Sequence, residues 1–340
     1  MASKKSQVIK EILHKNHKFY GDLSMEMLIK RIGENTVQRS IKPAYKTNEI
    51  VLYNDDCREV ISRFPDNYVD MTFLDPPFNQ QKEYSLHDDD MPEDKYWEMM
   101  KNVCQSVYDI TANGGCIYFM QREKNTEFVL RTLRETGWNF QNLIIWKKRT
   151  SAVPVTGKYG KQYQIIAYAV KGNRAKTFHR LRIDPELPPN YKFQRENGVF
   201  VTDVWDDIRE LTSGYFAGDE ALRTDSGERF HKQQTSLALL LRLILTSTSP
   251  GDTILDPFAG TGTTAVTAMQ LQRNSIAIEI DPINVECIKK RLENLREADS
   301  LQKYYKDYRC TENISTIFGC ELDDMPKPKP KKSELFKIVS

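Results

Sequence analysis

Residues 253–265 read TILDPFAGTGTTA, and this segment decides the fold class. It is typical of a short strand that enters a tight glycine turn and continues into a helix. Gly260 and Gly262 let the backbone turn sharply and approach a ligand without a Cβ in the way. The helix that follows presents free N–H groups and the positive end of its dipole to an anionic ligand. We therefore expect a ligand site at this turn.

A carboxylate follows this turn at a spacing that suits ribose recognition. Glu279 ends the next expected strand, 19 residues after Gly260, where it can accept hydrogen bonds from two ribose hydroxyls. The pattern Gly-x-Gly-x-x-Ala also fits the fingerprint of a nicotinamide dehydrogenase, and a glycine turn without a ligand stays open as well. A P-loop is excluded because no Gly-Lys-Ser/Thr follows. A dehydrogenase is disfavoured because the turn lies late in the chain and leaves little sequence for a substrate domain.

Strands and helices alternate on both sides of this segment. The expected strands are 50–53, 69–74, 116–120, 143–146, 164–170, 253–255 and 275–280. The expected helices are 96–110, 126–135, 237–245, 263–271 and 284–296. This alternation predicts an α/β domain with a largely parallel sheet.

A second turn carries a specific chemistry. Residues 69–79 read VDMTFLDPPFN, an apolar strand that ends in an acidic turn stiffened by prolines. A strand that simply ends at proline is the structural alternative. An exocyclic base amine is a poor nucleophile because its lone pair is delocalised into the ring. Asp75 can accept a hydrogen bond from that amine, a contact worth about 1.5–3 kcal/mol, and so turn its lone pair toward an electrophilic methyl group.

The rest of the turn suits the same chemistry. Pro76 and Pro77 have no N–H, so their carbonyls are left free to act as the second acceptor for the amine. Phe78 offers a flat face on which an extruded base can stack, which offsets the few kcal/mol that unstacking costs. The candidate catalytic residues are therefore Asp75, Pro76, Pro77 and Phe78.

Composition is that of an ordinary soluble globular protein. The chain has 340 residues and a net charge of +2. No apolar run approaches the roughly 20 residues that cross a bilayer, so we expect a cytoplasmic protein without a membrane segment. The six cysteines form no CxxC pair and the five histidines are scattered. We therefore expect reduced, packed thiols and no metal.

Positive charge is concentrated in the middle of the chain. Residues 147–195 hold twelve basic residues against only Asp184 and Glu186, with aromatic residues interleaved. Such a run is often only a solvated face, but it is also typical of a surface that follows phosphates. The expected DNA contacts are Lys147, Lys148, Arg149, Arg174, Lys176, Arg180 and Arg182.

The order of these features resembles the amino-methyltransferases of DNA in their β group. In that family an Asp/Asn/Ser-Pro-Pro-aromatic motif comes first, a target-recognition region follows, and a Phe-x-Gly-x-Gly motif lies near the C-terminus. This chain has Asp75–Phe78, then the irregular basic segment, then Phe258–Gly262. The lead-in LYNDDC at 52–57 and FPDNYVD at 64–70 is similar too. The resemblance covers roughly residues 48–295.

The resemblance implies a Rossmann-like methyltransferase fold, with a seven-stranded sheet in which one strand is antiparallel. It implies S-adenosylmethionine as the cofactor and no metal. The strand before Asp56 would then lie beside the strand that ends in Glu279. Asp56 would bind the cofactor's adenine, Glu279 its ribose, and Asp256 would lie near its methionine amine. The implied cofactor-binding residues are Asp56, Asp256, Phe258, Gly260, Gly262, Thr263 and Glu279.

Periodicity and composition, together with the resemblance, predict a domain organisation. An N-terminal helical extension would occupy 1–47, and the catalytic domain 48–171 and 231–298. A target-recognition insertion would occupy 172–230, and a C-terminal extension with a flexible Pro/Lys tail 299–340. The segment HKQQTS at 231–236 departs from the family's usual His-Pro-Thr-Gln-Lys-Pro, which puts a carboxylate-binding role there in doubt.

The expected activity is methyl transfer to adenine N6 in double-stranded DNA, by base flipping and direct in-line transfer. Adenine is preferred to cytosine N4 because family members that act on cytosine usually carry Ser at the position of Asp75. A nicotinamide oxidoreductase, a methyltransferase for RNA or protein glutamine, and a catalytically silent DNA-binding module remain as alternatives. The sequence leaves open a homodimer and a separate cognate restriction endonuclease.

Overall fold

The computed structural model describes residues 41–79, 91–148, 156–184, 197–211, 218–224, 226–231 and 233–321. All of the described strands and helices belong to one compact unit that begins at Pro43. Three expectations of the sequence lie outside the described residues: the N-terminal helices before residue 41, Arg149, and the Pro/Lys tail after residue 321.

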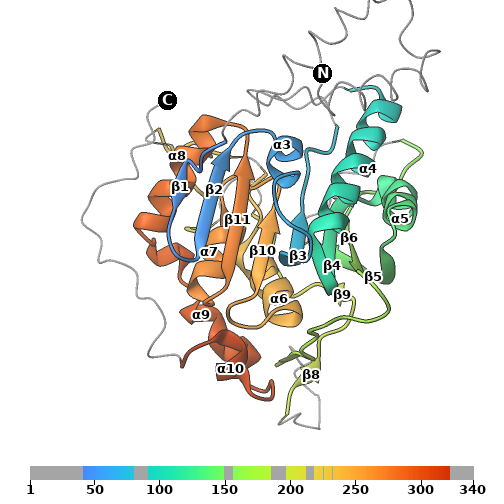
Figure 1. Ribbon diagram of the computed structural model, residues 1–340. Coiled ribbons are helices and arrows are strands. Elements are labelled where there is room, and N and C mark those ends of the chain that lie inside the picture. The colour runs from blue at the N-terminus through green and yellow to red at the C-terminus, as the bar shows by residue number, and fades with distance from the viewer. Residues whose placement is uncertain are drawn as a thin grey trace, which may run out of the picture. The chain divides into compact units, whose positions relative to one another are not determined.

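A large mixed sheet forms the centre of this unit (Figure 1). Its strands, in spatial order, are β1 (Tyr45–Lys46), β2 (Ile50–Asn54), β11 (Asn274–Glu279), β10 (Thr253–Asp256), β3 (Val69–Leu74), β4 (Thr111–Arg122), β6 (Tyr163–Val170), β5 (Asn139–Lys147) and β9 (Val204–Trp205). From β2 to β4 all neighbours run parallel, and β6 is antiparallel to both β4 and β5. Without the two-residue edge strands β1 and β9, this is the expected seven-stranded sheet with one antiparallel strand.

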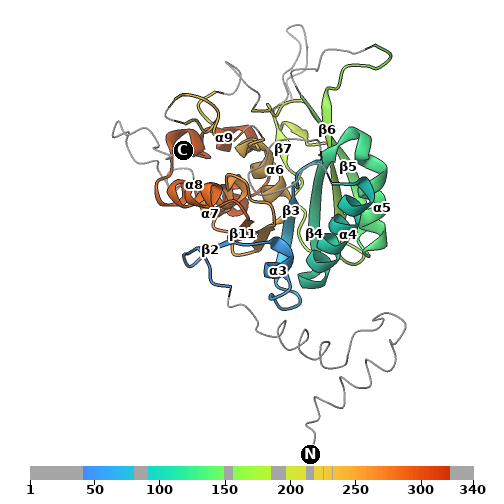
Figure 2. The same cartoon turned by 90° about the horizontal axis from the view of Figure 1, so that it is seen from above.

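Helices cover both faces of the sheet (Figure 2). On one face lie α3 (Cys57–Ile61), α4 (Glu93–Ile110) and α5 (Thr126–Glu135), and on the other α6 (Leu237–Ser247), α7 (Thr263–Gln270) and α8 (Pro282–Glu293). The expected helices are confirmed with their ends shifted by a few residues. Local chemistry explains two of the starts. Ser236 caps α6 by accepting from Leu239 N, and Asp281 caps α8 with Pro282 in its first turn.

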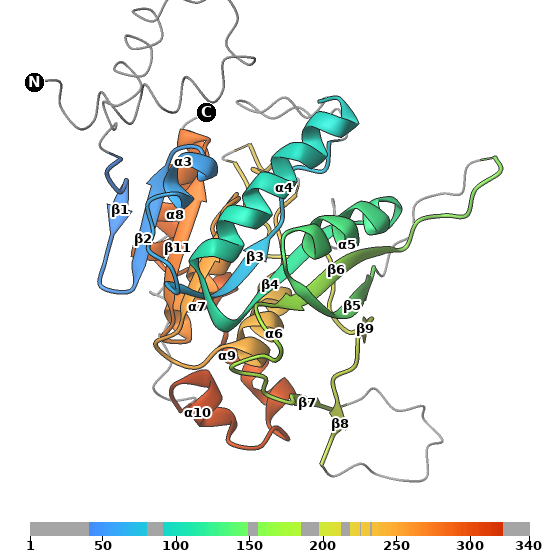
Figure 3. The same cartoon turned by 45° about the vertical axis from the view of Figure 1, so that its right-hand side comes forward.

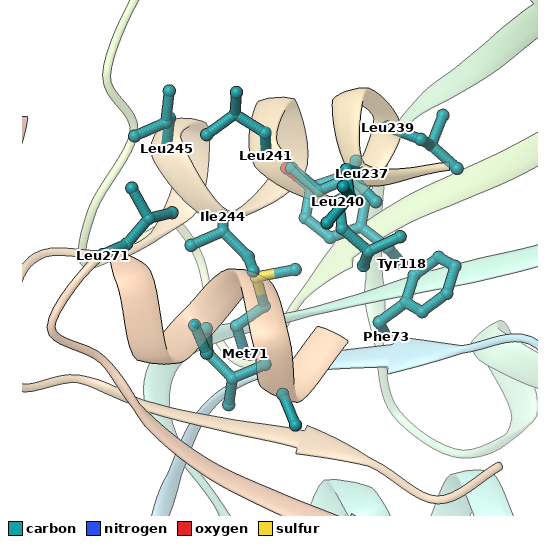
Figure 4. Close-up of a cluster of buried hydrophobic side chains, with 14 of the residues drawn as sticks. Met71, Phe73, Tyr118, Leu237, Leu239, Leu240, Leu241, Ile244, Leu245 and Leu271 are labelled. Carbon is teal, nitrogen blue, oxygen red and sulfur yellow. The ribbon is translucent and has the colours of Figure 1, made fainter. Parts of the chain in front are cut away.

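Helix α6 is apolar around almost its whole circumference because it is buried on all sides. Its leucines and Ile244 pack over Met71 and Phe73 of β3 and over Tyr118 of β4 (Figure 4). Each of these side chains is nearly inaccessible to solvent. Burial of a leucine or phenylalanine contributes about 1.5–3 kcal/mol, so α6 and β3 form one well-fixed unit.

Smaller elements lie at the far end of the sheet. The hairpin of β7 (Arg182–Ile183) and β8 (Val199–Phe200) comes from the predicted insertion. The chain after α8 forms η3 (Glu297–Asp299), α9 (Gln302–Tyr305), η4 (Lys306–Tyr308) and α10 (Ile314–Phe318), and Phe318 packs into the main core. Figures 1 and 3 show β8 and α10 at the end of the sheet opposite to α3.

In the described residues, no helix is both long and apolar enough to span a membrane. All six cysteines are free thiols, and four of them are buried, as the sequence predicted.

Candidate functional site

The two turns singled out in the sequence lie side by side. β3 and β10 are hydrogen-bonded parallel neighbours, with Met71 opposite Ile254 and Thr72 opposite Leu255. Asp75 directly follows β3, and the glycine turn directly follows β10. Both therefore lie at the end of the sheet where its parallel strands terminate, which we call the carboxyl edge. This is the place where open α/β sheets bind ligands.

Two further predicted residues lie at the same edge. β11 follows β10 in the sheet and ends in Glu279, and β2 lies beside β11, as expected. Asn54 at the end of β2 donates its amide to the carbonyls of Glu279 and Ile280, at 3.0 and 2.9 Å. Asp56 follows two residues later. Four adjacent strands thus bring Asp56, Glu279, the glycine turn and Asp75 to one edge.

The Asp75 turn is held by two partly buried contacts that the sequence did not reveal. The Thr235 hydroxyl donates to Asp75 Oδ2 at 3.0 Å. The Tyr96 hydroxyl donates to the Pro77 carbonyl at 2.7 Å and accepts from Gln121 Nε2 at 3.0 Å. Tyr96 and Gln121 are buried. The expectation that both proline carbonyls are free is therefore wrong for Pro77, whose carbonyl is already bonded.

The end of this turn is also fixed. Phe78 is half-buried and packs against the main core. Asn79 adopts a left-handed backbone with φ 52°, and its side chain donates to Met91 O at 2.6 Å and accepts from Met91 N at 2.8 Å. Asn79 thus joins the Asp75 turn to the start of the segment that leads into α4.

The two glycines of the other turn have different surroundings. Gly260 has φ 53°, and a Cβ placed there would meet only the Phe258 carbonyl, at 4.0 Å. Gly262 has φ 76°, and a Cβ there would lie 2.7 Å from Ile288 Cγ1 on α8. Gly260 therefore leaves open space on the side where a ligand can approach, whereas Gly262 allows α8 to pack closely. The sequence analysis had predicted that both glycines let the backbone approach a ligand closely.

The carboxylates near the glycine turn hold its backbone. Asp256 accepts from Phe258 N at 3.1 Å and from the Thr264 hydroxyl at 2.5 Å. Burial raises the pKa of Asp256 to about 7. Glu279 accepts from Gly260 N at 2.7 Å and from Asp281 N at 2.8 Å, and burial raises its pKa as well. Both carboxylates thus accept hydrogen bonds from the backbone of this turn or its flanks, and their expected contacts with a ribose and a methionine amine stay predictions.

Asp56 and Thr263 complete the predicted cofactor residues. Asp56 caps α3 by accepting from Arg58 N at 2.9 Å, and it forms an ion pair with the Arg58 side chain. Thr263 is buried and begins α7. Arg58 is a residue that the sequence did not single out.

A buried ion pair lies behind the glycine turn. Arg291 on α8 donates to the Thr261 carbonyl at 2.5 Å and pairs with Asp299 at 2.8 Å, and both side chains are fully buried. Arg296 also pairs with Asp299 at 2.7 Å. The two arginines hold the pKa of Asp299 well below its usual range, against the effect of burial. The only sequence signal was basic residues near the end of an expected helix.

The predicted DNA contacts do not form one surface. Because β5 runs parallel to β4, its last residue Lys147 and the following Lys148 lie at the carboxyl edge. β6 runs the other way, so the chain after it, with Arg174 and Lys176, lies at the opposite end. Lys176 forms ion pairs there with Asp70 and Asp252, at 2.9 and 3.2 Å.

Arg180 and Arg182 lie at that opposite end too. Their guanidinium groups lie 5.5 and 3.9 Å from the centre of the Phe200 ring on β8. The expected DNA contacts are thus divided between the two ends of the sheet, because the antiparallel strand β6 reverses the chain between the two groups. Among the described residues, no group of His, Cys, Asp and Glu could hold a metal ion.

Comparison with known proteins identifies the family. The family described as DNA methylase, which groups N6 and N4 methyltransferases, matches residues 69–290. The type II methyltransferase M.BamHI of Bacillus amyloliquefaciens is 32% identical over an alignment that covers 80% of this chain. The alignment covers 64% of the length of M.BamHI. The DNA adenine methyltransferase YhdJ of Escherichia coli (strain K12) is 30% identical over 78% of this chain and 90% of its own length.

The fold has a solved counterpart. The PvuII DNA methyltransferase, which is cytosine-N4-specific, aligns with a TM-score of 0.55 at 18% identity, over 83% of this chain and 97% of that one. This likeness supports the fold alone, while the family match covers both functional turns. The chain belongs to the N6/N4 amino DNA methyltransferase family.

Proposed function

We propose that the protein transfers a methyl group from S-adenosylmethionine to the exocyclic amine of a base in double-stranded DNA, with adenine N6 as the target. The observation that carries the proposal is the pairing of β3 with β10, which sets the Asp75 turn beside the Gly260 turn at one edge. A methyl donor and a methyl acceptor need such neighbouring sites, because in-line transfer requires the reacting atoms to lie within about 3–3.5 Å.

The glycine turn fits the cofactor. The open space at Gly260 admits a ligand against the backbone, and the N-terminus of α7 lies directly behind it. Asp56 and Glu279 lie on the two adjacent strand ends, at places suited to the adenine amine and the ribose. When bound, S-adenosylmethionine supplies an electrophilic methyl group on its sulfonium. Phe258, Gly262, Thr263 and Asp256 shape and hold this turn.

The Asp75 turn would receive the extruded base. The Asp75 carboxylate accepts a hydrogen bond from the target amine, and the Pro76 carbonyl accepts the second. The Pro77 carbonyl already accepts one hydrogen bond from Tyr96, which fixes the turn. Phe78 stacks on the base. These contacts localise the nitrogen lone pair and aim it at the methyl group, and the amine loses its proton late in the transfer or after it.

Adenine is proposed on the identity of residue 75. An aspartate stands there, where family members that act on cytosine N4 usually have serine. Of the three proteins compared above, YhdJ is named for adenine and the PvuII enzyme for cytosine N4. The proposal therefore rests on Asp75 itself.

DNA phosphates would be contacted along the carboxyl edge. Lys147 and Lys148 lie there, and Lys158 and Lys161 lie in the connection between β5 and β6 at the same edge. Between these two lysines, the Tyr159 side chain is 99% exposed. Basic and aromatic side chains next to a methyl-transfer site suit a DNA backbone.

The test is methyl transfer to duplex DNA, followed by nucleoside analysis by mass spectrometry. We expect N6-methyladenine; N4-methylcytosine would refute the choice of base, and labelled RNA or protein without labelled DNA would refute the substrate. Asp75→Ala should abolish transfer and leave cofactor binding measurable by calorimetry. Asp66→Ala is the matched control, because Asp66 is an exposed carboxylate that precedes β3 at the other end of that strand.

A further inference from the structure

One hydrogen bond of the site has no role in the proposed reaction so far, and it joins Asp75 to a residue 160 positions later in the chain. The Thr235 hydroxyl donates to Asp75 Oδ2 at 3.0 Å. Thr235 lies in the HKQQTS segment, where the sequence departs from the pattern of its family. Both side chains are partly buried.

The backbone on both sides of Thr235 is held firmly. Before it, the Gln234 side chain accepts from Leu222 N at 2.9 Å and donates to the Glu220 carbonyl at 3.0 Å. After it, the Glu220 carboxylate accepts from Leu237 N at 2.6 Å. Gln234 is buried, and its bond from Leu222 N is buried too. The backbone on both sides of Thr235 is thus anchored by contacts that do not involve Asp75.

The helix that follows Thr235 is fixed to the strand that carries Asp75. Leu237 and Leu240 at the start of α6 pack toward Phe73, which lies two residues before Asp75 on β3 (Figure 4). The Thr235–Asp75 hydrogen bond thus closes one end of a rigid unit made of α6 and β3. A carboxylate on such a short side chain is still able to rotate about its last torsion, which is broad in aspartate. The hydrogen bond from the Thr235 hydroxyl to Oδ2 restricts that rotation.

We propose that Thr235 is a positioning residue for methyl transfer. Its hydroxyl fixes the rotation of the Asp75 carboxylate, so that the carboxylate meets the target amine in the orientation that directs the lone pair at the methyl group. Threonine suits this role because its β-branched side chain is stiff at χ1. The inference rests on the proposed function, since it assigns Thr235 to that reaction. A misplacement of about 1 Å in a reacting group lowers rates by about 100-fold.

The test compares two substitutions in single-turnover methyl transfer. Thr235→Val keeps the shape and removes the hydroxyl, whereas Thr235→Ser keeps the hydroxyl. We expect Thr235→Val to lower the transfer rate by about tenfold to a hundredfold. The KM for DNA and the affinity for S-adenosylhomocysteine should change by no more than about twofold. Thr235→Ser should restore most of the rate, which a merely structural role for this residue would not predict.

Other outcomes refute the role. Thr235→Val with the wild-type rate, equal losses in the Val and Ser variants, or a loss confined to KM would each overturn it. If Thr235→Val does not fold, Thr235→Ala removes the same hydroxyl without placing a second methyl group in the site, and the same result is expected. Wild-type protein that methylates no DNA would overturn the proposed function, and this inference with it. An active wild type with unaffected variants would overturn the inference alone.

Discussion

The two glycines of the glycine turn should have different effects on stability and on ligand affinity when each is changed to alanine. Gly262→Ala would place a methyl group 2.7 Å from Ile288 Cγ1 and 2.9 Å from Cγ2. These atoms are close to the α8 backbone on a stiff β-branched side chain, so they are unable to move away easily. Gly260→Ala would meet only the Phe258 carbonyl at 4.0 Å. Both residues have a positive φ, so both variants carry backbone strain.

The magnitudes separate the variants. A left-handed backbone costs a non-glycine residue about 1–2 kcal/mol, and overpacking of a core costs about 1–3 kcal/mol. We therefore expect Gly260→Ala to lower the free energy of unfolding by about 1–2 kcal/mol and Gly262→Ala by about 2–5 kcal/mol. Urea unfolding of the ligand-free protein measures both values. The affinity for S-adenosylhomocysteine, measured by calorimetry, should show the reverse order, with a loss of about tenfold or more only for Gly260→Ala.

A double variant identifies the cause. Ile288→Ala removes the atoms that the new methyl group would strike, so Gly262→Ala should cost less in that background, with an interaction energy of about 0.5–3 kcal/mol. Equal destabilisation of the two glycine variants, or strictly additive effects in the double variant, would refute the packing argument. Unchanged ligand affinity in Gly260→Ala would refute the assignment of the open space to the cofactor.

Three further predictions concern other parts of the site. Burial raises the pKa of Asp256 from 3.8 to about 7, so the folded state keeps a proton that the unfolded chain loses. This contribution to stability therefore declines as the pH rises from about 4 to about 7. Asp256→Asn should flatten the pH dependence of the free energy of urea unfolding over that window, and an unchanged slope would contradict the assignment. Tyr96→Phe leaves the Gln121 amide without its acceptor and should lower the free energy of unfolding in urea by about 1–3 kcal/mol. It should also slow single-turnover methyl transfer, because the Pro77 carbonyl loses its donor. Wild-type values in both assays would show that Tyr96 does not stabilise the turn. Lys158→Ala should reduce the slope of log affinity for DNA against log salt concentration by about 0.9, and the control Arg180→Ala at the opposite end should leave it unchanged. The reverse result would indicate that DNA binds at the opposite end.

Much of this protein was readable from short-range sequence signals. The order of strands and helices along the chain follows from local periodicity. Each of the two turns can be recognised from a few consecutive residues, DPPF at 75–78 and DPFAGTG at 256–262. Strand direction was also accessible, because a helix between two strands brings the next strand back parallel. The order of the strands is not a local property, and the expected neighbourhood of Asp56 and Glu279 came from the family resemblance.

Only the tertiary structure decided which groups the site leaves available. Tyr96 bonds the Pro77 carbonyl, Thr235 bonds Asp75, and Arg291 supports the glycine turn, although each partner lies far away in sequence. The basic run divides because β6 is antiparallel, which carries the residues after it to the opposite end of the sheet. Local patterns fix the conformation of a segment, but hydrogen-bond partners and charged surfaces depend on packing between segments, which no single stretch of sequence encodes.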